Sequence, residues 1–187
     1  MSPDFFKMSP QEFNEYMKKS YPKMFWEIGL PPNKSLMAFG CSVGKGWRPL
    51  LDALASSLQF DTDKNGYPQV WANQVKEKFG GLRFYHTIVP KGKRPSGLKD
   101  MLMDFLRFVT IKKVGFINLM YYKHYGTKSR GRYDQLIGEI RGKIIFAESL
   151  SYRICEKCGT MKNVDTRGGS WVHSWCNNCE QEYKEGK

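Results

Sequence analysis

Four cysteines near the C-terminus constrain the fold of this chain more than any other feature. They form two C-x-x-C pairs, Cys155 with Cys158 and Cys176 with Cys179, and seventeen residues separate the pairs. This spacing is typical of a site in which four thiolates surround one zinc ion in a tetrahedral shell. Because a closed shell leaves no position open for water or substrate, the sequence predicts a structural Zn²⁺.

The residues around these cysteines predict a zinc ribbon over residues 151–187. Gly159 follows the first pair directly and tolerates the positive φ that the turn needs. Residues 161–164 and 171–175 are expected to form two short strands, joined by a turn at residues 167–169. Since so small a unit cannot build a sufficient core, metal binding is expected to supply its folding free energy.

Three further side chains near this unit have more than one interpretation. Trp171, His173 and Trp175 fall on one face of the returning strand by the two-residue period of a strand. This face can stack on bases, contact a protein or pack on the rest of the chain, and packing is the default. With four thiolates available, His173 is expected to be solvent-facing or packed and not a ligand. The remaining cysteine, Cys41, is expected to be a small buried apolar group.

Disulfide bonds are the alternative for the four cysteines, and the sequence disfavours them. Two disulfides require an oxidising compartment, and residues 1–13 contain no apolar segment of signal-peptide length. The longest uncharged stretch in the apolar middle of the chain is residues 114–122, less than half of a membrane-spanning helix. We therefore expect a cytoplasmic protein with no membrane partner.

Apolar periodicity upstream predicts an α+β core domain over residues 1–150. A Ser cap, Pro10 and Glu12 open the first helix, and three further helices are expected at 47–59, 98–109 and 133–150. Strands are expected at 36–39, 69–78 and 82–89, the last two joined as a hairpin through the Gly-Gly pair. The predicted fold is therefore a small antiparallel sheet with packed helices and a C-terminal four-cysteine zinc ribbon.

The positive charge of the chain is concentrated in one segment. The formal net charge is +12, and residues 91–132, expected to be a basic helical segment, carry eleven basic against two acidic residues. Such clustering favours a polyanionic partner, because phosphate contacts release condensed counterions. The alternative is a solubilising surface without a partner.

Basic residues interleaved with Gly, Ser and Tyr at 125–133 are the most nucleic-acid-like part of that segment. A mobile surface loop is the alternative for this stretch. The candidate phosphate contacts are Lys91, Lys93, Arg94, Lys112, Lys113, Lys128, Arg130 and Arg132. The candidate stacking residues are Tyr125, Tyr133 and Trp171.

Three motifs, taken in order, resemble a group of small proteins encoded by bacteriophages and prophages. The motifs are Gly46-Trp47-x2-Leu50-Leu51-Asp52-x-Leu54, the QVKEKFGGLRFY stretch at 74–85, and Ala147-Glu148-x2-Ser151-Tyr152-x2-Cys155-x2-Cys158-Gly159. The resemblance covers about half of the chain. It implies a phage product in the host bacterial cytoplasm and assigns no catalytic residues.

These observations favour a non-enzymatic nucleic-acid-binding protein. The alternative is a protein-binding inhibitor or adaptor that acts on a host or defence protein, for which the apolar run 98–122 would supply a surface if it is not core. Catalysis is least favoured, because Asp52, Glu77 and His86 are scattered and Lys76, Glu77, Lys78 and Arg83 are more simply a charged sheet face. A phosphate-binding loop at residues 40–46 is rejected, because its glycines are one residue too close and a glycine replaces the Ser or Thr.

Overall fold

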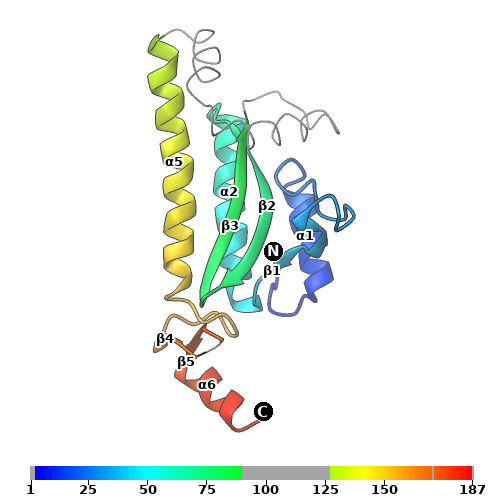
Figure 1. Cartoon of the computed structure of the whole chain (residues 1–187), viewed down its shortest axis with the longest axis vertical. Coiled ribbons are helices and arrows are strands. Elements are labelled where there is room, and N and C mark those ends of the chain that lie inside the picture. The colour runs from blue at the N-terminus through cyan, green and yellow to red at the C-terminus, as the bar shows by residue number, and fades with distance from the viewer. Residues whose placement is uncertain (1–2, 90–126, 170, 187) are drawn as a thin grey trace.

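A three-stranded sheet organises the described part of the chain, which comprises residues 3–89, 127–169 and 171–186 of a computed structural model. Strand β1 (Cys41–Ser42) pairs in parallel with β2 (Gln69–Lys78), and β2 pairs antiparallel with β3 (Gly81–Val89). Helices α2 and α5 lie beside this sheet, and a smaller unit occupies one end of the long axis (Figure 1). The α+β class is confirmed, although β1 makes the sheet mixed.

The predicted hairpin is confirmed, and its turn contains a bulky residue in a rare conformation. Phe79 and Gly80 are the two residues between the strands, with φ values of 55° and 73°. Positive φ at both central residues matches the type I′ turn, whose twist suits that of the flanking strands. A register shift between Ala72 and Gln74 further bends β2.

The strand expected at residues 36–39 is wrong. Leu36–Phe39 form a single 3₁₀ turn, η1. The hydroxyl of Ser35 accepts a hydrogen bond from the Met37 backbone N–H at 3.0 Å, which caps the turn. Gly40, with φ of 68°, ends it, so that strand pairing begins only at Cys41.

Helix α1 (Pro10–Ser20) begins with the capping box that the sequence predicted. The Glu12 N–H donates to Ser9 Oγ at 3.2 Å, and the Ser9 N–H donates to Glu12 Oε2 at 2.7 Å. Phe13 and Met17 on this helix are buried. The helix thereby covers one side of the core near β1.

Helices α2 (Arg48–Lys64) and α5 (Thr127–Ser151) pack against each other and the hairpin; a 3₁₀ turn, η2 (Lys45–Trp47), precedes α2. An ion pair between Lys143 and the buried Asp61 links the two helices. Helix α5 begins at Thr127 and not at the expected residue 133, so the alternative prediction of a loop is wrong for residues 127–133. Lys and Arg are good helix formers, and no proline interrupts this stretch. The helix expected at 98–109 lies outside the described residues.

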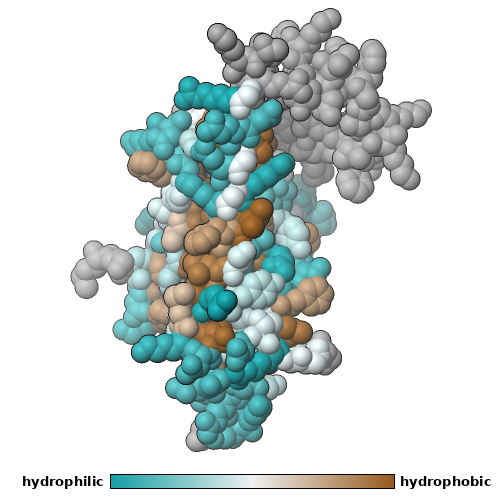
Figure 2. Space-filling view, turned by 90° about the vertical axis from the view of Figure 1, so that its left-hand side faces the viewer, coloured by the Kyte–Doolittle hydropathy of each residue, from teal (hydrophilic) through white to brown (hydrophobic). Residues whose placement is uncertain are grey.

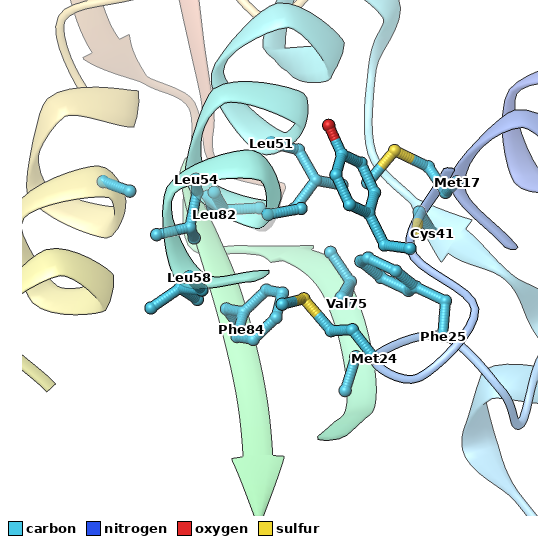
Figure 3. Close-up of a cluster of buried hydrophobic side chains, with 14 of the residues drawn as sticks. Met17, Met24, Phe25, Cys41, Leu51, Leu54, Leu58, Val75, Leu82 and Phe84 are labelled. Carbon is cyan, nitrogen blue, oxygen red and sulfur yellow. The ribbon is translucent and has the colours of Figure 1, made fainter. Parts of the chain in front are cut away.

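The core lies between α2 and the inner face of the hairpin (Figure 3). Its members from different elements include Met17, Met24, Phe25, Leu51, Leu54, Leu58, Val75, Leu82 and Phe84. Cys41 belongs to this cluster as expected, and burial raises the pKa of its thiol to about 12. From α5, Ile140, Ile144 and Ala147 complete the same core.

The C-terminal unit pairs β4 (Val164–Arg167) antiparallel with β5 (His173–Cys176) and ends in α6 (Asn177–Lys184). The first strand begins three residues later than predicted. Asn163 has φ of 53°, a left-handed conformation that asparagine tolerates and that interrupts an extended backbone. The turn at Gly168 (φ 117°) lies where the sequence placed it.

Candidate metal centre and nucleic-acid interface

The four cysteines of the two C-x-x-C pairs converge on one point. All four Sγ atoms lie within 4.8 Å of one another, and Cys158 Sγ lies 3.7 Å from Cys176 Sγ. The first pair lies on the turn after α5, whereas Cys176 ends β5 and Cys179 lies in the first turn of α6. Three of the four are buried and Cys158 is exposed. This group can hold a metal ion, as the spacing predicted.

The pKa values of three of these thiols are shifted, and not all in the same direction. Burial is the largest effect on the pKa values of Cys158 and Cys179, which it raises. At Cys176, burial is opposed by the backbone N–H of Cys179 and by the neighbouring sulfurs, and the pKa is lowered overall. A divalent cation at the centre would favour thiolates at all four positions, so metal binding would release protons.

The first C-x-x-C turn is closed by its own backbone. The Cys155 N–H donates to Thr160 O and the Gly159 N–H donates to Cys155 O, both at 2.8 Å. Gly159 has φ of 75°, as its position after the pair led us to expect. The turn therefore presents its sulfurs from a fixed loop.

Residues 44–47 hold this turn against the body of the protein. The Gly46 N–H donates to Glu156 O at 2.8 Å, and Trp47 Nε1–H donates to Ile154 O at 2.8 Å. A Cβ on Gly46 would lie 2.1 Å from Cys155 O, so only glycine allows this approach. Gly44 and Gly46 thus serve contact between the body and the cysteine turn, whereas Gly40 lies against Asn14.

The tip of the β2–β3 hairpin contacts the other side of the C-terminal unit. The Ser174 hydroxyl donates to Gly80 O at 2.6 Å. A Cβ on Gly81 would lie 2.4 Å from the Tyr152 ring. The three motifs singled out in the sequence therefore meet at one place, which we call the ribbon junction (residues 44–47, 79–84 and 148–160).

The end of α5 completes the ribbon junction by covering the edge of β3. The Leu82 N–H donates to Ser151 Oγ at 2.9 Å, and the Phe84 N–H donates to Glu148 Oε1 at 2.7 Å. These side chains satisfy backbone groups that an edge strand would otherwise expose. Glu148 and Ser151 of the motif at residues 147–159 consequently have a structural role.

Asp52, Glu77 and His86 lie apart, and each has a structural hydrogen-bond partner. Asp52 Oδ1 accepts from the hydroxyls of Tyr16 at 3.0 Å and Tyr21 at 2.7 Å. Glu77 Oε1 accepts from the Gly80 N–H at 2.6 Å. His86 Nδ1 lies 3.1 Å from Phe84 O. The structure does not bring these three groups together.

The returning strand begins at His173 and not at Trp171, so only His173 and Trp175 of the three expected residues lie in β5; these two are packed and Trp171 is exposed. His173 is buried, its Nε2 lies 2.8 Å from Glu180 Oε2, and its ring centroid lies 3.9 Å from that of Trp175. The packed interpretation of His173 is confirmed. Trp171 remains 56% exposed, in edge contact with Trp175 at 5.9 Å.

The predicted nucleic-acid contacts lie largely beyond the described residues. Those outside are Lys91, Lys93, Arg94, Lys112, Lys113 and Tyr125. Lys128 and Arg130 lie in the first turn of α5. The exposed Arg132 and the partly exposed Tyr133 follow in the same helix. This end of α5 lies at the opposite end of the helix from the cysteine cluster (Figure 1).

A basic face on the hairpin was missed as a candidate interface. By the strand register, Lys76 lies opposite Arg83, and Gln74 lies opposite Tyr85. These residues and Lys78 share the face opposite the core, while Val75 and Phe84 point into the core. None of the β2 or β3 residues on this outer face is Asp or Glu. We call Gln74, Lys76, Lys78, Arg83 and Tyr85 the hairpin face; its two-residue alternation is visible in the sequence.

Comparison with protein-family models, curated proteins and solved structures finds no match to this chain. Separately, no helix in residues 3–89, 127–169 or 171–186 is both long and apolar enough to cross a membrane. The site must therefore be interpreted from its own chemistry.

Proposed function

We propose that this chain is a non-enzymatic nucleic-acid-binding protein with one structural zinc ion. The observation that carries the binding function is the hairpin face, where three cations and an aromatic ring share one sheet surface without a carboxylate. The metal would fix the ribbon junction at the base of this surface.

The cysteine geometry supports zinc as the metal. Four thiolates are a donor set that favours zinc or iron–sulfur centres over oxygen-preferring cations. Zinc–sulfur bonds of about 2.3 Å in a tetrahedron separate the sulfurs by about 3.8 Å. The Cys158–Cys176 separation of 3.7 Å agrees with that value. With four protein ligands the shell is closed, so the ion would act in folding and not in catalysis.

The charges of the hairpin face support a polyanionic partner. Within the described residues, neither Lys76 nor Lys78 forms an ion pair. The Lys76 ammonium lies 5.4 Å from the Tyr85 ring centroid, and the Lys78 ammonium lies 5.3 Å from that of Phe79. The one carboxylate between them, Glu77, is on the opposite side of the strand and accepts from Gly80. Phosphates are the ligands that such a surface attracts.

The first experiment is purification from bacterial lysate with and without nuclease. Nucleic acid that co-elutes and is lost on nuclease treatment supports the proposal. Binding to a labelled oligonucleotide is then measured across salt concentrations. Each lost phosphate contact lowers the slope of log affinity against log salt by about 0.7–0.9.

A matched pair of double variants separates the hairpin face from overall charge. Lys76→Gln with Lys78→Gln is expected to weaken binding and reduce the salt slope by about 1.4–1.8. Lys34→Gln with Lys64→Gln removes the same charge from exposed positions elsewhere and is expected to change binding little. Equal effects of the two pairs would reduce the proposal to unspecific attraction. Lys128→Gln, Arg130→Gln and Arg132→Gln together test the contacts that the sequence suggested.

A protein-binding inhibitor or adaptor is the second candidate function. Figure 2 shows hydrophobic side chains gathered halfway along the side of the molecule on which α5 lies. On α5, Ile145 is 60% exposed and Phe146 is 67% exposed. A defined host or defence protein that co-elutes stoichiometrically and survives nuclease and high salt would favour this function. A phage product in bacterial cytoplasm suits either function, because reduced thiols can bind zinc there.

A further inference from the structure

Phe79 occupies a position where a large side chain is unfavourable. It has φ of 55° at the first central position of a type I′ turn, where Asn, Asp and Gly are preferred. Its ring is also 66% exposed. Neither the turn nor the core gains from a phenylalanine here. Strained residues of this kind are concentrated at functional sites, which makes Phe79 a candidate for contact with a ligand.

Trp171 is a second exposed ring beside Phe79. It belongs to the C-terminal unit, where its ring packs in an edge contact against Trp175. Its indole is 56% exposed although the neighbouring Trp175 is buried. An aromatic ring supported on one side and exposed on the other can stack with a planar ligand at small entropic cost.

The two rings line one open cleft of about 290 Å³. Its other lining residues are Lys76, Glu77, Lys78 and Val172. The volume is close to the lower limit of small-ligand sites, about 300 Å³, and suits one planar group. The lysines are two of the three cations of the hairpin face, and the carboxylate of Glu77 accepts a hydrogen bond from the Gly80 N–H. Within the described residues, the cleft therefore combines two exposed rings with two lysines that form no ion pair and one carboxylate, so its lining is net positive.

We propose that this cleft binds an unpaired base of a single-stranded nucleic acid by stacking on Phe79 or Trp171. Lys76 and Lys78 would contact the adjoining phosphates. Stacking on aromatic rings beside a basic groove is how sequence-tolerant binding of single strands is achieved, and paired bases cannot offer their faces in this way. The inference rests on the proposed function and specifies its site and its ligand.

The test compares one labelled single-stranded oligodeoxynucleotide of mixed sequence with its duplex, by fluorescence anisotropy on the intact protein. Phe79→Asn keeps a residue that tolerates positive φ and removes the ring. This variant is expected to raise the melting temperature and to weaken single-strand binding about 5- to 150-fold. Trp171→Ala is expected to weaken it in the same range. Phe60→Ala, which removes an exposed ring from α2, serves as the control.

The outcomes separate this inference from the proposed function. Tighter binding of the single strand than of the duplex, lost in both variants and kept in the control, supports the cleft. Wild-type binding that Phe79→Asn and Trp171→Ala leave unchanged overturns the cleft while the proposed function stands. Preference for the duplex overturns the single-strand assignment. Failure of the wild-type protein to bind either oligonucleotide overturns both proposals.

Discussion

Substitution of Gly46 tests how closely the body and the cysteine turn depend on each other. In Gly46→Ala the added Cβ would lie 2.1 Å from Cys155 O, 2.6 Å from Gly159 N and 2.7 Å from Glu156 O. All three are backbone atoms, so the turn must move away by roughly 1 Å to restore ordinary contact. This movement strains or breaks the hydrogen bonds from Gly46 to Glu156 and from Trp47 to Ile154.

The expected cost adds overpacking, about 1–3 kcal/mol, to two weakened hydrogen bonds of about 1 kcal/mol each. The free energy of unfolding should therefore fall by about 3–5 kcal/mol, which is roughly 6–20 °C in melting temperature for a chain of this size. Thermal unfolding followed by circular dichroism measures the loss. Transfer of zinc to a chromophoric chelator should be faster in the same variant.

A matched glycine in α5 provides the control. A Cβ on Gly142 would meet nothing within 4 Å, and the residue lies inside a helix. Gly142→Ala should therefore stabilise the protein by about 0.5–1 kcal/mol. Wild-type stability and zinc retention in Gly46→Ala would refute the close approach on which the ribbon junction depends.

The metal site and the Asp52 hydrogen bonds give three further predictions. Chelation of the metal under reducing conditions should expose Trp175, which should shift tryptophan fluorescence to the red. Added zinc should reverse the shift, and most of the helical circular dichroism should be retained throughout. Loss of all helical signal would contradict a body that is folded independently. Asp52→Ala should lower the free energy of unfolding by about 1–3 kcal/mol in urea titration, because the hydroxyls of Tyr16 and Tyr21 lose their shared acceptor. An unchanged urea midpoint would argue against these two hydrogen bonds. Burial, followed by the hydrogen bond to Asp52, raises the pKa of Tyr21 above the ordinary value of 10. Above pH 10 the unfolded chain therefore releases a proton that the folded chain keeps, and the free energy of unfolding should fall as pH rises. Tyr21→Phe should flatten this dependence.

Elements with a strong local signal could be predicted from the sequence. The capping box at Ser9, the apolar stripe of α2 and the alternation of residues 82–89 each depend on contacts within or beside one element. The cysteine cluster was equally predictable, because its spacing alone restricts the geometry of the chain. These features set both the fold class and the metal site.

The remaining elements could not be predicted, either because local capping residues outweighed the apolar pattern or because they depend on distant contacts. Leu36–Phe39 have strand-like side chains, yet Ser35 and Gly40 turn them into a 3₁₀ helix. Gly46 stands where a phosphate-binding loop has Ser or Thr, and only the approach of Cys155 from more than a hundred residues away explains this glycine. The hairpin face required the register between β2 and β3, although the alternation of Lys76 with Glu77 hinted at it.

X-ray absorption at the zinc edge, together with the zinc content of the purified protein, tests the central claim most directly. The account predicts one zinc ion per chain with four sulfur neighbours at about 2.3 Å. Substoichiometric zinc with freely titratable thiols, or a shell containing nitrogen or oxygen, would contradict a closed site formed by Cys155, Cys158, Cys176 and Cys179.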